Sequence, residues 1–175
     1  MALTKEELRA LEDLYMAIPS DKLKTVLKYF LFACFTGMRY QDIKDIKHSN
    51  LHLEHGNPCA LFIQHKTKEP LTLPLNKKAL SYVSSEGLPN NPVFMVYSIQ
   101  YTDRLLKEIM ELAKIHKSIS FHCSRHTCAS ILQELGGDLL TTSKLLGQRK
   151  LSTTQLYTRV SESAKRILME MMEVI

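Results

Sequence analysis

One apolar run early in the chain restricts its fold more than any other feature. Between residues 23 and 34, apolar side chains recur at the three- and four-residue spacing of a buried helix. Only ten uncharged residues separate Lys28 from Arg39, whereas a helix needs about 20 apolar residues to span a bilayer. The pattern therefore predicts a helix in the core of a globular domain. Gly37 stands where such a helix ends in the left-handed conformation, so Arg39 is expected just past a buried helix end.

Length and composition fit one globular domain. A chain of 175 residues is long enough to bury a core, and 45% hydrophobic with 23% charged residues exclude a disordered or fibrous chain. The first residues lack the apolar segment of a secretory signal, so we expect a cytoplasmic protein with no membrane segment. The four cysteines form no Cys-x-x-Cys pair and are expected to be buried and reduced: Cys34, Cys59, Cys123 and Cys128. Three histidines in a predicted loop lack a Glu or Cys that would complete a tetrahedral metal site: His48, His52 and His55.

Periodicity and turn residues predict a mostly α fold with a small antiparallel β-hairpin, an α+β class. A capping box of Thr4 and Glu7 opens the first helix, and residues 48–58 read as a loop or weak strand. Two short strands are expected at 60–64 and 71–73, joined by a polar tip that carries Lys66 and Lys68. The predicted helices cover 4–18, 21–36, 42–46, 76–84, 98–116 and 123–135, a stretch before Gly147, 153–157, and 161 to the C-terminus.

Four short features carry side chains suited to chemistry, although each alone has an ordinary structural explanation. Arg39 follows a helix-ending glycine, where an arginine is usually solvated. His122 and Arg125 lie at a predicted helix start, and such pairs commonly pack on a neighbouring element. Lys66 marks a hairpin tip, and Tyr157 fits a half-buried aromatic residue.

The order and spacing of these features resemble the catalytic domain of the tyrosine recombinases, the phage integrase family, over nearly the whole chain. The family's first box matches Thr36-Gly37-Met38-Arg39, with Asp42 three places on. The second box, His-x-x-Arg-His-Thr, matches residues 122–127. His65-Lys66-Thr67-Lys68 resembles the β-hairpin lysine segment, and Tyr157 lies nine residues after Gln148, the spacing of the family's nucleophile. Four ordered matches are far less probable by chance than any one.

The resemblance implies site-specific DNA strand cleavage and rejoining through a covalent 3′-phosphotyrosine, without metal, ATP or other cofactor. Tyr157 is then the nucleophile, and Arg39 with Arg125 is the cationic clamp on the phosphate. His122 is the proton acceptor for the tyrosine, whose ordinary pKa is near 10. Lys66 is the general acid for the leaving 5′-oxygen, with Lys68 as the alternative. The supporting residue is Asp42, which orients the active-site helices by hydrogen bonding.

Gln148 departs from the family pattern, which has His or Trp at this position. An amide NH₂ can also donate to a phosphate, but its longer side chain costs about 1 kcal/mol more to order. We therefore expect activity with a slower cleavage step.

The charge distribution favours double-stranded DNA as the partner. The chain carries a net charge of +5, and residues 141–160 alone carry four cations and no acidic residue. We expect Lys68, Arg149 and Lys150 to contact phosphates. The resemblance further implies a single catalytic domain over 1–175, with the family's N-terminal core-binding domain outside this chain. It also implies a homotetramer on DNA, assembled through the C-terminal helix, and a free fragment that can be monomeric. The predicted apolar stripe of this helix suits packing on its own chain as well as on a neighbouring protomer: Ile167, Leu168, Met171 and Met172. Two alternatives remain: a catalytically idle DNA-binding module, and a type IB topoisomerase.

Overall fold

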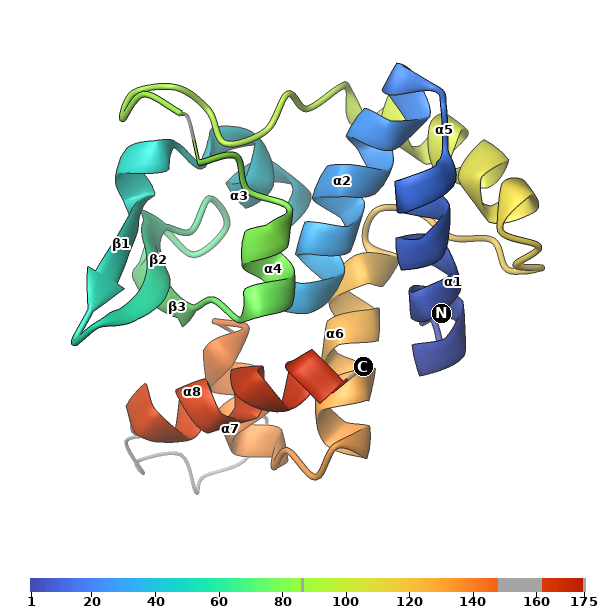
Figure 1. Ribbon diagram of the computed structural model, residues 1–175. Helices are drawn as coiled ribbons and strands as arrows, with labels where there is room; N and C mark the ends of the chain where they lie inside the picture. The colour runs from blue at the N-terminus through green and yellow to red at the C-terminus, as the bar shows by residue number, and fades with distance from the viewer. Residues whose placement is uncertain (86, 148–161, 175) are drawn as a thin grey trace.

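Helix α2 (Asp21–Thr36) is the centre of the molecule. Every residue from Tyr29 to Thr36 is buried, as the apolar run predicts. The helix ends at Gly37, whose φ of 67° is the left-handed conformation expected from the sequence. Helices α1, α3, α4, α5 and α6 all pack against α2 (Figure 1). The short α3 that begins at Tyr40 is therefore anchored to the core at its first turn.

The computed structural model describes residues 1–85, 87–147 and 162–174, and the predicted α+β class is confirmed. None of the helices in these ranges is long and apolar enough to cross a lipid bilayer. All four cysteines are buried, as expected, and none forms a disulfide within the described residues. The elements are α1 (Lys5–Ala17), α2 (Asp21–Thr36), α3 (Tyr40–Asp45), a 3₁₀ turn (His48–Asn50), β1 (Leu51–Glu54), β2 (Asn57–Ile63), β3 (Pro70–Pro74), α4 (Lys77–Ser81), α5 (Ile99–Leu112), α6 (Cys123–Glu134), α7 (Leu139–Leu145), α8 (Glu162–Glu170) and a second 3₁₀ turn (Met171–Val174).

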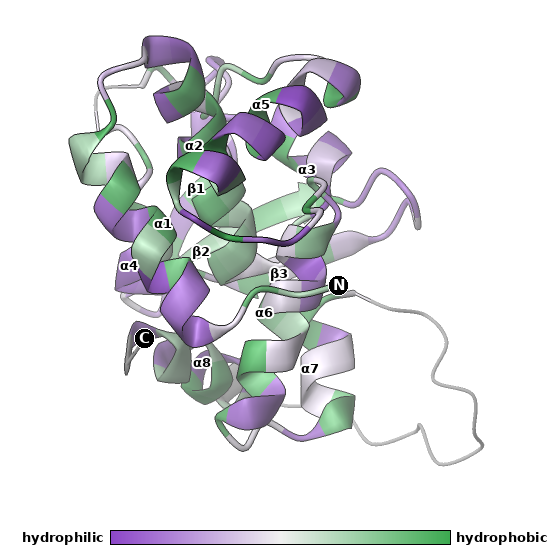
Figure 2. Cartoon of the chain, turned by 90° about the vertical axis from the view of Figure 1, so that its right-hand side faces the viewer, coloured by the Kyte–Doolittle hydropathy of each residue, from purple (hydrophilic) through white to green (hydrophobic). Residues whose placement is uncertain are grey.

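The sheet has three antiparallel strands in the order β1-β2-β3. The weak-strand interpretation of 48–58 is the correct one, because β1 pairs with β2 from Leu51↔Ala60 to Glu54↔Asn57. Strands β2 and β3 pair from Cys59↔Pro74 to Ile63↔Pro70, which leaves residues 64–69 as the hairpin tip. In Figure 2 the strand β2 is largely hydrophobic, whereas the outer turns of α5 are hydrophilic. The sheet lies beside the helical core in Figure 1, and its buried residues Ala60, Phe62 and Leu73 belong to that core.

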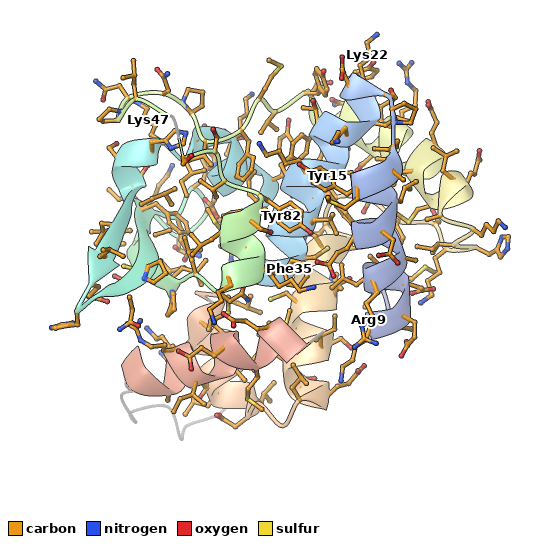
Figure 3. The ribbon with its side chains drawn as sticks, viewed as in Figure 1. Arg9, Tyr15, Lys22, Phe35, Lys47 and Tyr82 are labelled. Carbon is orange, nitrogen blue, oxygen red and sulfur yellow. The ribbon has the colours of Figure 1, made fainter. Side chains whose placement is uncertain are left out.

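Aromatic rings join α1 and α4 to the central helix. The Tyr82 ring lies 5.4 Å from that of Tyr15 on α1 and 6.2 Å from that of Phe35 on α2 (Figure 3). Lys78 donates two 2.8 Å hydrogen bonds to the carboxylate of Glu12 beside these rings. The β3–α4 segment is therefore fixed to the same core as α2.

The C-terminal helix α8 packs on its own chain. Asn76 donates a hydrogen bond to the Met169 carbonyl at 3.2 Å, and the Lys77 backbone N–H donates to Glu173 at 2.9 Å. Leu168, Met169 and Met172 are buried. The predicted apolar stripe is therefore wrong in part, because Ile167 is 60% exposed and Met169 takes its place in the contact.

Candidate active site

The first box folds into a tight corner that aims Arg39 beside Asp42. Gly37 allows the chain to turn sharply after α2, and Arg39 becomes the residue that precedes the first turn of α3. The Arg39 side chain is only 19% exposed, and its Nη1 lies 3.9 Å from Oδ2 of Asp42. Asp42 Oδ1 accepts a 2.8 Å hydrogen bond from the backbone N–H of His65. Asp42 thus makes an orienting hydrogen bond, but its partner is the hairpin rather than another helix.

Arg125 on α6 is buried and bridges two chain turns. Its Nη1 donates to the Gly37 carbonyl at 2.8 Å, and its Nη2 donates to the Leu146 carbonyl at 2.7 Å. Burial, followed by the charge of Arg39, lowers the Arg125 pKa to about 10, so the guanidinium stays protonated at neutral pH. The planar fork therefore supplies both a fixed positive charge and a rigid link between the first box and the end of α7.

Lys66 lies exposed at the tip of the β2–β3 hairpin. The tip is closed by hydrogen bonds from the Gln64 N–H to the Glu69 carbonyl and from the Lys68 N–H to the Gln64 carbonyl, both 2.9 Å. Lys68 has a φ of 58°, so it serves as the left-handed residue of the turn. The charge of Lys66 is among the causes that lower the His122 pKa. Lys66 at the hairpin tip therefore acts electrostatically on the histidine.

His122 lies at the start of α6, next to a small pocket. This pocket of about 70 Å³ is lined by Met38, Arg39, Tyr40, Ile99, Phe121, His122, Ser124 and Arg125. Partial burial lowers the pKa of His122 first, followed by the charges of His126, Arg125, Arg39 and Lys66. The His126 ring is perpendicular to that of His122, with centroids 4.8 Å apart. A neutral imidazole beside two guanidinium groups suits a proton acceptor next to a bound oxyanion.

Gln64 is a site residue that the motifs do not reveal. It is 3% exposed, and with its amide oxygen toward Arg39 it accepts a 2.8 Å hydrogen bond from that guanidinium. Its signal in the sequence is the strand alternation, because Ala60, Phe62 and Gln64 share the inward face of the predicted strand. A polar residue on a buried face requires a specific partner.

The remaining predicted residues lie outside the described ranges. They are Gln148, Arg149, Lys150 and Tyr157, together with the predicted helix over 153–157. The described part of the chain brings Arg39, Asp42, Lys66, His122 and Arg125 together from three separate segments: the α2–α3 corner, the hairpin tip and the start of α6. It also places Gly147, the last described residue before position 148, against Gln64.

Solved structures share this fold. An integrase from mycobacterium phage Brujita superposes with a TM-score of 0.71 over 98% of this chain and 57% of that one, at 22% identity. The XerH site-specific recombinase bound to its difH substrate gives a TM-score of 0.68 over 93% of this chain and 51% of that one, also at 22% identity. At this identity the likeness establishes the fold alone.

Sequence comparison extends the likeness to the family. The tyrosine recombinase XerD of Listeria innocua is 33% identical over 145 residues, covering 73% of this chain and 47% of the relative. The chain thus spans about half the length of the curated relatives it matches. The model of the phage integrase family matches residues 2–164, a range that includes both boxes, the hairpin lysine and the tyrosine. The resemblance drawn from the motifs is therefore confirmed, and the chain belongs to the phage integrase family of tyrosine recombinases.

Proposed function

We propose that this chain is a catalytic domain that cleaves and rejoins double-stranded DNA at specific sites. The observation that carries the proposal is the convergence of Arg39, His122 and Arg125 on one small pocket, with Lys66 close enough to act on His122. Permanently cationic forks suit the extra charge of a pentacoordinate phosphate, and no metal ion is needed for that role. Family membership and the XerD likeness support the same activity.

The proposed cleavage step balances as a transesterification. The Tyr157 oxygen attacks phosphorus, the bond from phosphorus to the 5′-oxygen breaks, and a 3′-phosphotyrosine forms. The phenol proton passes to the neutral His122, and the 5′-oxygen takes a proton from the Lys66 ammonium. Arg39 and Arg125 stabilise the charge on the two non-bridging oxygens. Rejoining is the reverse reaction with another 5′-hydroxyl.

The DNA contacts and the assembly are part of the same proposal. Lys68 is exposed on the hairpin tip, and we place it with Arg149 and Lys150 against backbone phosphates. Two duplexes that exchange strands present four strands for cleavage, so we infer a tetramer on DNA, with one protomer for each strand. Mass photometry of the protein–DNA complex should give the mass of four protomers with two duplexes. A monomer is expected without DNA, because α8 packs on its own chain. We also propose a cytoplasmic location, since buried reduced thiols fit a reducing compartment.

A covalent-capture experiment tests the function. Duplexes with a randomised centre and a nick near it are incubated with the protein, because a nick lets the short cleaved product diffuse away and traps the intermediate. We expect a denaturant-resistant adduct, with a phosphotyrosine at position 157 by mass spectrometry. Sequencing the captured strands defines the site used in all later rate measurements. DNA binding without any adduct would refute the enzyme and support the idle-module alternative.

Replacing Gln148 with histidine is expected to raise the single-turnover cleavage rate several-fold. The shorter imidazole side chain loses less conformational freedom, a difference of about 1 kcal/mol. Adduct formation is followed on the captured site with protein in excess. An unchanged or lower rate would contradict the proposed cost of ordering the glutamine.

Replacing His126 with glutamine is expected to move the acid limb of the pH–rate profile to higher pH. His122 must be neutral to accept the tyrosine proton, so the rate falls as the pH drops through its pKa. The groups that lower this pKa are His126 and Arg125 on α6, Arg39 after α2, and Lys66 on the hairpin, in addition to partial burial. Removing one like charge raises the pKa toward its ordinary value.

The profile is measured as single-turnover cleavage from pH 5 to 8. His116→Gln is the matched control, because His116 is exposed after α5 and does not line the pocket. If the His126 variant and the control share the wild-type profile, His122 does not titrate as the base.

A further inference from the structure

A buried amide links the hairpin to the rest of the phosphate pocket. Gln64 is 3% exposed and lies between the Arg39 guanidinium and the Leu146–Gly147 turn. With its oxygen toward Arg39, its nitrogen donates to Thr67 Oγ1 at 2.9 Å and to the Gly147 carbonyl at 3.2 Å. The opposite orientation would set amide hydrogens against guanidinium hydrogens. All three contacts are thus satisfied by one orientation.

The packing around the amide is tight. A Cβ added to Gly147 would lie 2.4 Å from both terminal atoms of Gln64, and Gly147 has a φ of 63°. The adjacent Leu146 carbonyl accepts from Arg125 at 2.7 Å. One turn therefore receives hydrogen bonds from both Gln64 and the second arginine of the clamp.

The same amide reaches the hairpin tip next to its lysine. Thr67 directly follows Lys66, and the His65 backbone that precedes it is held by Asp42 at 2.8 Å. Both neighbours of Lys66 are thereby tied to the Arg39 corner, although the lysine itself is exposed. A mobile side chain on a fixed backbone has a restricted reach, which favours one position for its ammonium.

We propose that Gln64 is a positioning residue that holds the Lys66 hairpin in register with Arg39. This inference rests on the strand-cleavage function above. Gln64 touches no reacting atom. It sets where the general acid stands relative to the clamp, so its loss slows departure of the 5′-oxygen more than it weakens DNA binding.

The test replaces Gln64 with leucine, which has similar volume but makes no hydrogen bond. We expect the single-turnover cleavage rate to fall on the order of 10- to 100-fold, as for a small misplacement of a reacting group. Affinity for the captured site should change less than threefold. Gln41→Leu is the matched control, because the Gln41 amide donates to Asp45 within α3 and not to the pocket. It should cleave at the wild-type rate.

A second substrate separates positioning from general disruption. When sulfur replaces the bridging 5′-oxygen, the leaving thiolate needs no general acid, because a thiol has a pKa near 8.5. On the sulfur substrate, we expect Gln64→Leu to reduce the cleavage rate by a factor at least fivefold smaller than on the oxygen substrate. The rate reduction caused by Lys66→Ala should also be smaller on the sulfur substrate. A defect of equal size on both substrates would overturn the inference, as would a variant that cleaves within threefold of wild type.

Thr67→Val covers the case in which Gln64→Leu does not fold. It removes only the hydroxyl that receives the Gln64 amide, and Thr67 is only partly buried at the hairpin tip. Slower cleavage of the oxygen substrate with near-normal cleavage of the sulfur substrate is expected, and wild-type rates on both would refute the coupling. Wild-type protein that forms no adduct on either substrate would instead refute the cleavage function itself.

Discussion

Replacing Tyr157 with phenylalanine is expected to abolish the covalent protein–DNA adduct. The change removes one oxygen atom, which is the atom that must bond to phosphorus, and leaves the ring in place. Loss of a nucleophile lowers turnover by a factor on the order of 10⁴ or more. On denaturing gels the adduct band should therefore vanish, while binding to the captured site persists.

The matched control is Tyr15→Phe. Tyr15 packs its ring against Tyr82 at 5.4 Å on the α1–α4 side of the molecule, so losing its hydroxyl leaves that packing intact. The control should form adduct at the wild-type rate. An adduct that persists in Tyr157→Phe would show that another residue attacks the phosphate, and the assignment of the nucleophile would fail.

Glycine made some helix ends predictable from sequence. Gly37 has a φ of 67° and follows α2, which ends at Thr36 as predicted. Gly136 has a φ of 92° and follows α6, which ends at Glu134, one residue before its predicted end. Helix α5 ends at Leu112, four residues before its predicted end, because Lys114 takes a φ of 56° there. The Ile115 N–H then donates to the Met110 carbonyl at 2.8 Å, which closes the helix. A lysine in the left-handed conformation leaves no signal in the sequence, so that boundary could not be predicted.

The first strand shows a similar ambiguity. His55 and Gly56 form a two-residue turn with φ values of 51° and 81°, as in mirror-image hairpin turns. Histidine is an unusual first residue for such a turn, and Pro58 argues against a strand because proline lacks an N–H. The pairing of residues 57–60 with the outer strand β1 overrides both signals. The local sequence alone therefore left the choice between loop and strand open.

Motif spacing predicts the site residues that are proposed to act on the phosphate. It does not predict a residue whose role is to hold another side chain in position. Arg39, His122 and Arg125 were found from motif spacing, and they line one pocket. Gln64 donates to the carbonyl of Gly147, which is far away in the sequence, and no local pattern encodes that proximity. The alternation of strand residues indicates that Gln64 faces inward, but it does not indicate which groups Gln64 contacts. The role of Gln64 therefore depends on tertiary contacts between segments that are distant in the sequence.

Replacing Arg125 with lysine is expected to lower the single-turnover cleavage rate by a factor on the order of 10² to 10³. Lysine keeps the charge but replaces a planar fork of five donors with one compact ammonium. In the native protein the fork holds the Gly37 and Leu146 carbonyls at 2.8 and 2.7 Å. An ammonium cannot hold both carbonyls and a phosphate in that geometry, so transition-state stabilisation is lost.

The same substitution is expected to destabilise the fold, because buried carbonyls left without donors cost about 1–3 kcal/mol. Urea unfolding measures this loss, and cleavage is then compared at a temperature where both proteins are folded. Arg9→Lys is the control, since Arg9 is exposed on α1 and the substitution there should change neither quantity.

Arg39→Lys offers a sharper contrast. Arg39 bonds the Gln64 side chain rather than two backbone turns, so its lysine variant should lose rate with a smaller loss of stability. If Arg125→Lys cleaves within threefold of wild type, the guanidinium is only a structural link between α6 and its neighbouring turns, and the clamp on the phosphate must be assigned elsewhere.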